Sequence, residues 1–118
     1  MKQIELGQSG VKLGAIAYGC WRISRSKTHE ADRKIRTALD CGINIIDTAD
    51  IYGFGEPRDF GGAEAVLGDV LKASSDLRGK MYLATKGGID AVRPYDSTYD
   101  YLMSVSYTHL TLPTICSV

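Results

Sequence analysis

The chain has 118 residues, well short of the roughly 250 that are usual for a closed eight-stranded α/β barrel. Its 14 Lys and Arg balance its 14 Asp and Glu, so net charge does not favour nucleic acid, acidic substrates or anionic membranes as partners. Because no apolar run approaches the ~20 residues that span a bilayer and the N-terminus lacks the apolar segment of a signal peptide, we expect a cytoplasmic protein that binds a small molecule.

The first half of the chain predicts a hairpin, a strand, a helix and a second strand. Short apolar clusters over residues 4–13 flank "GQSG", which is typical of a β-hairpin. A short strand follows from Ala15 to Tyr18. Apolar residues then recur at helical spacing from Thr28 to Cys41, with Gly42 as the cap. The run "INIID" predicts a strand buried on both faces.

The second half adds a helix and a strand. A glycine-rich loop over residues 52–62 precedes a helix with apolar residues at Ala63, Val66, Leu67, Val70 and Leu71. After a polar turn, "MYLATK" predicts a strand that ends before Gly87 and Gly88. Strands that alternate with helices over short connections predict right-handed crossovers and a parallel sheet covered by helices, which is an α/β fold.

Residues able to carry chemistry follow three successive strands. They are Gly19, Cys20 and Trp21 after the first, Asp47 with Tyr52 after the second, and Lys86 after the third. Because functional groups of a parallel barrel collect where strands end, we expect these residues at one rim. Taken alone, each has a structural alternative: Asp47 as a cap, Tyr52 as a half-buried aromatic, and Lys86 as a solvated loop charge. Trp21 either packs on the rim or forms the wall of a substrate pocket.

The segments "GCW", "GINIIDTADIYG" and "ATKGG", taken together, resemble the aldo-keto reductase family. The resemblance covers about Gln3 to Leu102 and implies the N-terminal part of a (β/α)8 TIM barrel, about three βα units preceded by a β-hairpin, with the barrel incomplete. It implies an oxidoreductase that reduces aldehydes or ketones to alcohols by hydride transfer. The implied cofactor is NADP(H), and NAD(H) stays open.

The resemblance also assigns site residues. In the D-x-A-x-x-Y pattern the aspartate is Asp47 and the tyrosine is Tyr52, while Lys86 is the lysine of the third strand. Asp50 is not the matched acid, because Tyr52 follows it by only two positions. Implied cofactor contacts are Gly19, Cys20, Trp21 and Asp47.

Carbonyl reduction gives these residue types a chemical reason. Negative charge develops on the carbonyl oxygen, so a proton donor must lie beside it. An ammonium about 4 Å from a phenol stabilises the phenolate left after proton transfer by at most roughly 4 kcal/mol at an effective dielectric of about 20. A carboxylate in turn keeps that ammonium charged. We therefore expect Asp47, Tyr52 and Lys86 to act as a unit.

Other motifs give weaker signals. Gly53, Gly55, Gly61 and Gly62 do not form a dinucleotide-binding fingerprint, and we interpret them as a flexible active-site loop and helix entry. The three cysteines are widely spaced and predict neither a disulfide framework nor a metal site.

The fourth catalytic group of the family, a histidine on the next strand, has no clear counterpart. His29 lies near the start of the first helix, where a solvated or capping role is expected. His109 lies within residues 101–118, which contain no Lys, Arg, Asp or Glu although 24% of the chain is charged. Residues 105–114 are similar to the translation of a transposase-type sequencing-adapter end.

We therefore expect residues 1–104 to be the N-terminal fragment of an NADP-dependent oxidoreductase domain, and residues 105–118 to be a non-native tail. The alternative for the tail is a genuine strand with alternating Thr and Leu. Two other interpretations stay open: a non-catalytic or regulatory binding protein on the same barrel, and a small self-contained α/β domain. Substrate and oligomeric state are left open, and we expect the 118-residue chain itself to be poorly soluble and inactive.

Overall fold

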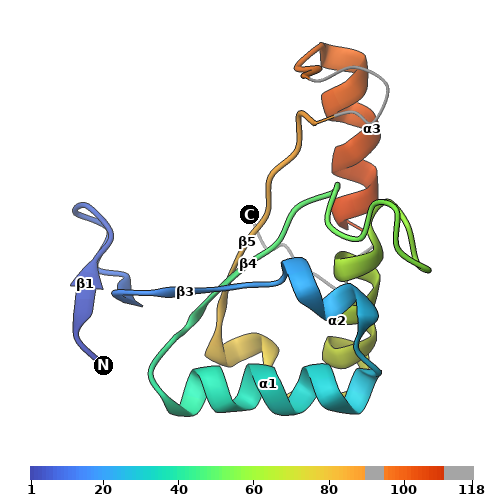
Figure 1. Cartoon of the computed structure of the whole chain (residues 1–118). Helices are drawn as coiled ribbons and strands as arrows, with labels where there is room; N and C mark the ends of the chain where they lie inside the picture. The colour runs from blue at the N-terminus through green and yellow to red at the C-terminus, as the bar shows by residue number, and fades with distance from the viewer. Residues whose placement is uncertain (90–94, 111–118) are drawn as a thin grey trace.

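The structure, a computed structural model, describes residues 1–89 and 95–110, and only the backbone of residues 106–110. Its elements in chain order (Figure 1) are β1 (Gln3–Glu5), β2 (Lys12–Gly14), β3 (Ala17–Gly19), the 3₁₀ turn η1 (Trp21–Arg25), α1 (Thr28–Asp40), β4 (Ile45–Asp47), α2 (Gly62–Ala73), the 3₁₀ turn η2 (Arg78–Lys80), β5 (Tyr82–Ala84) and α3 (Tyr99–Leu110). Within this described part, no helix is both long and apolar enough to cross a membrane.

The expected hairpin and parallel sheet are both present. β1 and β2 pair antiparallel, and the hairpin projects away from the helices (Figure 1). The other three strands form a parallel sheet in the order β3-β4-β5. Gly19 pairs with Asp47, and Asp47 pairs with Ala84. The C-terminal ends of the three strands therefore lie side by side, as the expected common rim requires.

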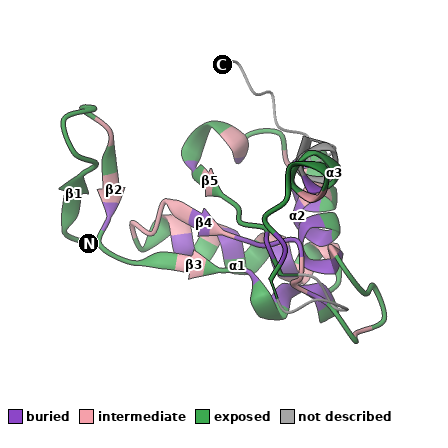
Figure 2. Cartoon of the chain, turned by 90° about the horizontal axis from the view of Figure 1, so that it is seen from above, coloured by how far each residue is buried: buried purple, intermediate pink, exposed green. Residues whose placement is uncertain are grey.

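Helices cover one face of this sheet. Tyr18, Ile46 and Leu83 pair across the strands and pack against the core formed with α1 and α2. Their neighbours Ile45 and Tyr82 point to the opposite face, and Figure 2 shows that these strands are only partly buried. The expectation that "INIID" is buried on both faces is therefore wrong for the described chain, because no described element covers the second face.

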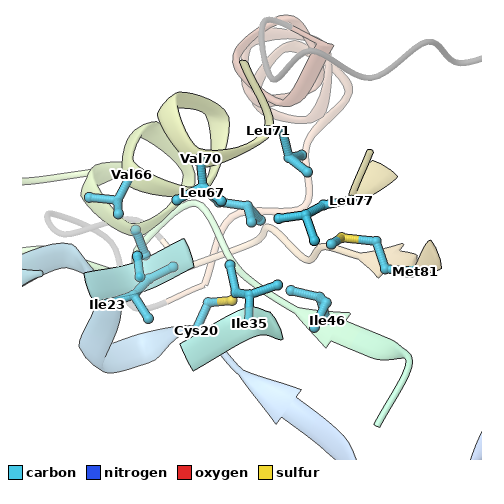
Figure 3. Packing of buried hydrophobic residues seen from close by; sticks show 12 residues of the cluster. Cys20, Ile23, Ile35, Ile46, Val66, Leu67, Val70, Leu71, Leu77 and Met81 are labelled. Carbon is cyan, nitrogen blue, oxygen red and sulfur yellow. The ribbon is translucent and has the colours of Figure 1, made fainter. Parts of the chain in front are cut away.

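The core lies between the covered face of the sheet and the two helices. Figure 3 shows its side chains, which come from η1, α1, α2, β4 and the segment before β5. Ile35 of α1 and Leu67 of α2 have no exposed surface, and each such burial contributes roughly 1.5–3 kcal/mol. α1 ends at Asp40, and Gly42 follows with φ +81°, the left-handed conformation typical of a residue just after a helix.

The last described element was not expected from the sequence. Residues 105–110 belong to α3, so the alternative strand is not present over them. Residues 111–118, the remainder of the expected tail, lie outside the described residues.

Candidate active site

Lys86 makes the central contacts of the rim. Its ammonium donates to Oδ2 of Asp47 at 2.8 Å and to the carbonyl oxygen of Thr48 at 3.0 Å. The ring of Tyr52 lies beside this ammonium, with its centre 4.6 Å from Nζ. These contacts bring together the acid, the phenol and the lysine that the sequence singled out.

Tyr52 is positioned by turns at the end of β4. Its backbone N–H donates to the carbonyl of Ala49 at 3.1 Å, and its own carbonyl accepts from Ala63 at 2.9 Å. Lys86 Nζ lies 4.6 Å from the centre of the Tyr52 ring. The ring therefore has a cation close to it.

The charge of Lys86 reflects opposing effects. Partial burial lowers the pKa of Lys86, but the hydrogen bond to Asp47 and then the proximity of Tyr52 raise it, and the net result is a pKa above the ordinary value. Half of the Lys86 side chain is exposed, so solvent screens these interactions. At neutral pH the ammonium form therefore persists.

Trp21 forms one wall of a pocket at this rim. Its ring stacks on Tyr52 with centroids 5.4 Å apart and an interplanar angle of 26°. The pocket has a volume of about 370 Å³, and Phe54, Lys86 and Ile89 also line it. Trp21 is 65% exposed, so it both packs on the rim and faces the pocket. Phe54 and Ile89 were not singled out in the sequence, because neither side chain carries a group that takes part in carbonyl reduction.

Gly19 and Cys20, two of the expected cofactor contacts, differ in accessibility. Gly19 is exposed at the end of β3. Cys20 has no exposed surface and belongs to the core, and its N–H donates to the carbonyl of Asp47 at 2.8 Å. Burial, followed by the charge of Asp47, raises the pKa of Cys20 to about 12. The expectation that Cys20 contacts a cofactor therefore does not fit the structure, since no atom of this residue reaches the surface.

Asp50 is a buried residue that makes hydrogen bonds to several segments of the rim. Only 1% of its surface is exposed, and its Oδ1 accepts the N–H of Ile51 at 2.6 Å. Its Oδ2 lies 2.8 Å from the hydroxyl of Tyr101 on α3. Its N–H donates to the carbonyl of Lys86 at 3.1 Å. Asp50 thus joins three segments of the rim, and no sequence motif pointed to its contact with Tyr101.

The glycine-rich loop is a succession of tight turns. Backbone N–H groups of Phe54, Glu56 and Asp59 each donate to a carbonyl three residues earlier. Gly53 has φ +111°, and a Cβ there would lie 2.6 Å from the carbonyl oxygen of Asp59. Glycine is therefore required at this position both by its conformation and by the close approach of the backbone.

His29 does not join the described rim. His29 is exposed near the start of α1, where Glu30 accepts the N–H of Lys27 at 3.0 Å. The backbone of His109 lies in α3, and its side chain is outside the described residues.

Comparison with known proteins relates this chain to one family. The model of the aldo/keto reductase family matches residues 15–110. The 6-dehydroglucose reductase of Novosphingobium aromaticivorans is 51% identical over 100 residues, which cover 83% of this chain and 33% of that protein. The 6-dehydroglucose reductase of Agrobacterium fabrum is 37% identical over 115 residues, which cover 86% of this chain and 36% of that protein. The chain thus spans about a third of the length of these curated relatives.

Solved structures agree with the fold. An aldo-keto reductase from Bacillus halodurans, in its holo form, superposes with a TM-score of 0.70 at 28% identity. The match covers 94% of this chain and 36% of that chain. The expected fold, the N-terminal part of a (β/α)8 barrel, is confirmed by this similarity.

Proposed function

The chain belongs to the aldo/keto reductase family, and on that premise we propose that the whole protein is a nicotinamide-dependent oxidoreductase that reduces an aldehyde or ketone to an alcohol. The observation that carries this proposal is the surroundings of the Lys86 ammonium, which is hydrogen-bonded to Asp47 and Thr48 and lies 4.6 Å from the centre of the Tyr52 ring. In carbonyl reduction, a lysine ammonium held beside a phenol stabilises the phenolate that forms when the phenol donates its proton.

Tyr52 is the proton donor in this proposal. Tyr52 lines the pocket with Lys86 Nζ 4.6 Å from the centre of its ring, so its O–H is placed to donate to the carbonyl oxygen of a substrate bound there. When the proton leaves, the ammonium of Lys86 stabilises the phenolate. Asp47 keeps that ammonium protonated and holds it in place through the 2.8 Å contact.

The residues present fit a nicotinamide cofactor, which when bound supplies the hydride. A side chain added at Gly19 would meet no atom within 4 Å, so there is open space beside the strand ends for a flat ring. Gly19, Trp21 and Asp47 would hold it. We propose NADP(H) as the cofactor, with NAD(H) as the alternative that a direct assay distinguishes.

The substrate proposal comes from the relatives. Two proteins at 51% and 37% identity are named 6-dehydroglucose reductase, so we propose a sugar aldehyde as the substrate class. The exposed ring of Trp21 beside the pocket supports this, since an aromatic face packs against the C–H groups of a sugar ring. We place this reaction in the cytoplasm, with no nucleic acid or membrane as partner.

Residues 1–104 carry this function in our proposal, and residues 105–118 are a non-native tail. The lack of any charged residue in residues 101–118 supports the second statement. The nucleotide sequence of the locus in an independent long read tests it: divergence after codon 104 is expected, and the same tail would contradict it. We place the catalytic histidine in the part of the protein that follows residue 104.

The experiment that tests the function joins residues 1–104 to the remaining two thirds of the Novosphingobium 6-dehydroglucose reductase. This chimera should oxidise NADPH when a sugar aldehyde is added, and NADH in parallel assays decides the cofactor. The 118-residue chain should show negligible activity in the same assay. A chimera whose circular dichroism equals that of the relative but that transfers no hydride would contradict the proposal, as would appreciable activity of the 118-residue chain.

A further inference from the structure

Glu56 connects the loop after Tyr52 to the helical turn that carries Trp21. Arg25 Nε donates to Glu56 Oε1 at 2.8 Å, and the hydroxyl of Ser24 donates to Oε2. Ser24 is buried, and only 12% of the Glu56 side chain is exposed. Each carboxylate oxygen of Glu56 therefore binds a different residue of η1.

The same two segments also meet on the side of the pocket. There the ring of Trp21, the first residue of η1, stacks on Tyr52. Ser24 Oγ, which binds Glu56, also lies 3.3 Å from the carbonyl oxygen of Trp21, so the Glu56 contacts are close to the backbone of the tryptophan. Loop and turn are thus joined at two places, one by charge and hydrogen bonds and one by aromatic packing.

The core by itself does not fix the ring of Trp21. η1 is a five-residue 3₁₀ turn, and such short turns depend on tertiary contacts for their position. Ile23 anchors the middle of η1 in the core, but Trp21 is 65% exposed. Among the described residues, the stack on Tyr52 restrains the ring of Trp21, while the buried Ile23 and the attachment to Glu56 hold η1 itself.

We propose that Glu56 is a positioning residue that holds Trp21 against Tyr52 and so fixes the aromatic wall of the pocket. The hydrogen bond from Ser24, together with Arg25, keeps the pKa of Glu56 below its ordinary value, so the carboxylate that makes both contacts persists into mild acid. The expected effect of Glu56 on substrate binding rests on the proposed function, whereas its expected effect on the motion of the Trp21 ring does not.

Trp21 is the sole tryptophan of the chain, so its fluorescence reports this restraint directly. Time-resolved anisotropy of the 118-residue chain, at low micromolar concentration, resolves the picosecond-to-nanosecond motion typical of loosely held side chains. Glu56→Ala should increase the amplitude of this fast component. Glu56→Gln keeps the shape of the side chain and one hydrogen-bonding oxygen, so its fast component should have a smaller amplitude than that of Glu56→Ala.

Asp69→Ala is the matched control. It breaks a 3.1 Å ion pair with Arg58, which ties the same loop to α2 without touching η1. This variant should leave the anisotropy decay unchanged. An equal decay in wild type and both Glu56 variants, or an equal change in Asp69→Ala, would overturn the proposal.

Kinetics of the chimera separate positioning from general damage. Glu56→Ala should raise KM for the sugar aldehyde about tenfold, the order of magnitude of a lost hydrogen bond to a charged group, and leave kcat unchanged. A fall in kcat at constant KM would contradict the proposed role. An inactive wild-type chimera would contradict the proposed function, while the anisotropy experiment would still decide the role of Glu56.

Discussion

Lys86 Nζ lies 2.8 Å from Oδ2 of Asp47, although the two residues are 39 positions apart in the chain. The parallel register of β4 and β5 explains this contact. Asp47 pairs with Ala84, and Lys86 follows Ala84 by two residues at the same end of the sheet. The ion pair is thus a direct result of the parallel βαβ topology, which brings the C-terminal ends of successive strands together.

Replacement of Asp47 should change the pH range of activity. Partial burial lowers the pKa of Lys86, and Asp47 supplies the largest opposing contact, so Asp47→Asn should lower this pKa. The alkaline limb of the kcat profile of the chimera should then move to lower pH. The ion pair's contribution to folding stability is present below the ordinary lysine pKa and is lost as the pH rises through the raised value.

Asp32→Asn is the control for this experiment, because it removes a carboxylate that binds Arg36 at 2.9 Å, on the surface of α1. Its kcat profile should match that of the unchanged chimera. An alkaline limb that Asp47→Asn does not move would show that Asp47 does not set the charge of Lys86.

Alanine at two glycines of the glycine-rich loop should reduce folding stability by different amounts. Gly55→Ala, at φ +73° with no atom within 4 Å, should cost about 1–2 kcal/mol of stability through backbone strain alone. Gly53→Ala should cost more, since its Cβ would also overlap the carbonyl of Asp59 at 2.6 Å. Urea unfolding of the two chimeras measures the difference, and equal midpoints would contradict the close approach at Gly53.

The two described cysteines should react very differently with iodoacetamide. Cys20 is fully buried and has a pKa raised to about 12, so little thiolate forms at neutral pH. Cys41 is exposed at the end of α1. Peptide mass spectrometry after labelling of the native chain should find the modification on Cys41. After denaturation, Cys20 should be modified as well. Rapid labelling of Cys20 in the native chain would contradict its place in the core.

The sequence predicted the strands, the first two helices and the Asp47, Tyr52 and Lys86 set, because each depends on local periodicity or on where a strand ends. It did not predict the contacts of Glu56 with η1 or of Tyr101 with Asp50. These join residues 31, 32 and 51 positions apart, so only the packed structure brings them together. Cys20 was misjudged because its position after β3 suggested the rim, whereas its side chain turns into the core.

The most direct test of the account is kcat of the chimera with Tyr52→Phe. This change keeps the ring that stacks on Trp21 and removes only the hydroxyl, so cofactor affinity should be unchanged while kcat falls by about 10²–10⁴. Tyr99→Phe, at an exposed tyrosine of α3, should leave kcat unaltered. If Tyr52→Phe retained the full kcat, Tyr52 would not be the proton donor and the proposed mechanism would be wrong.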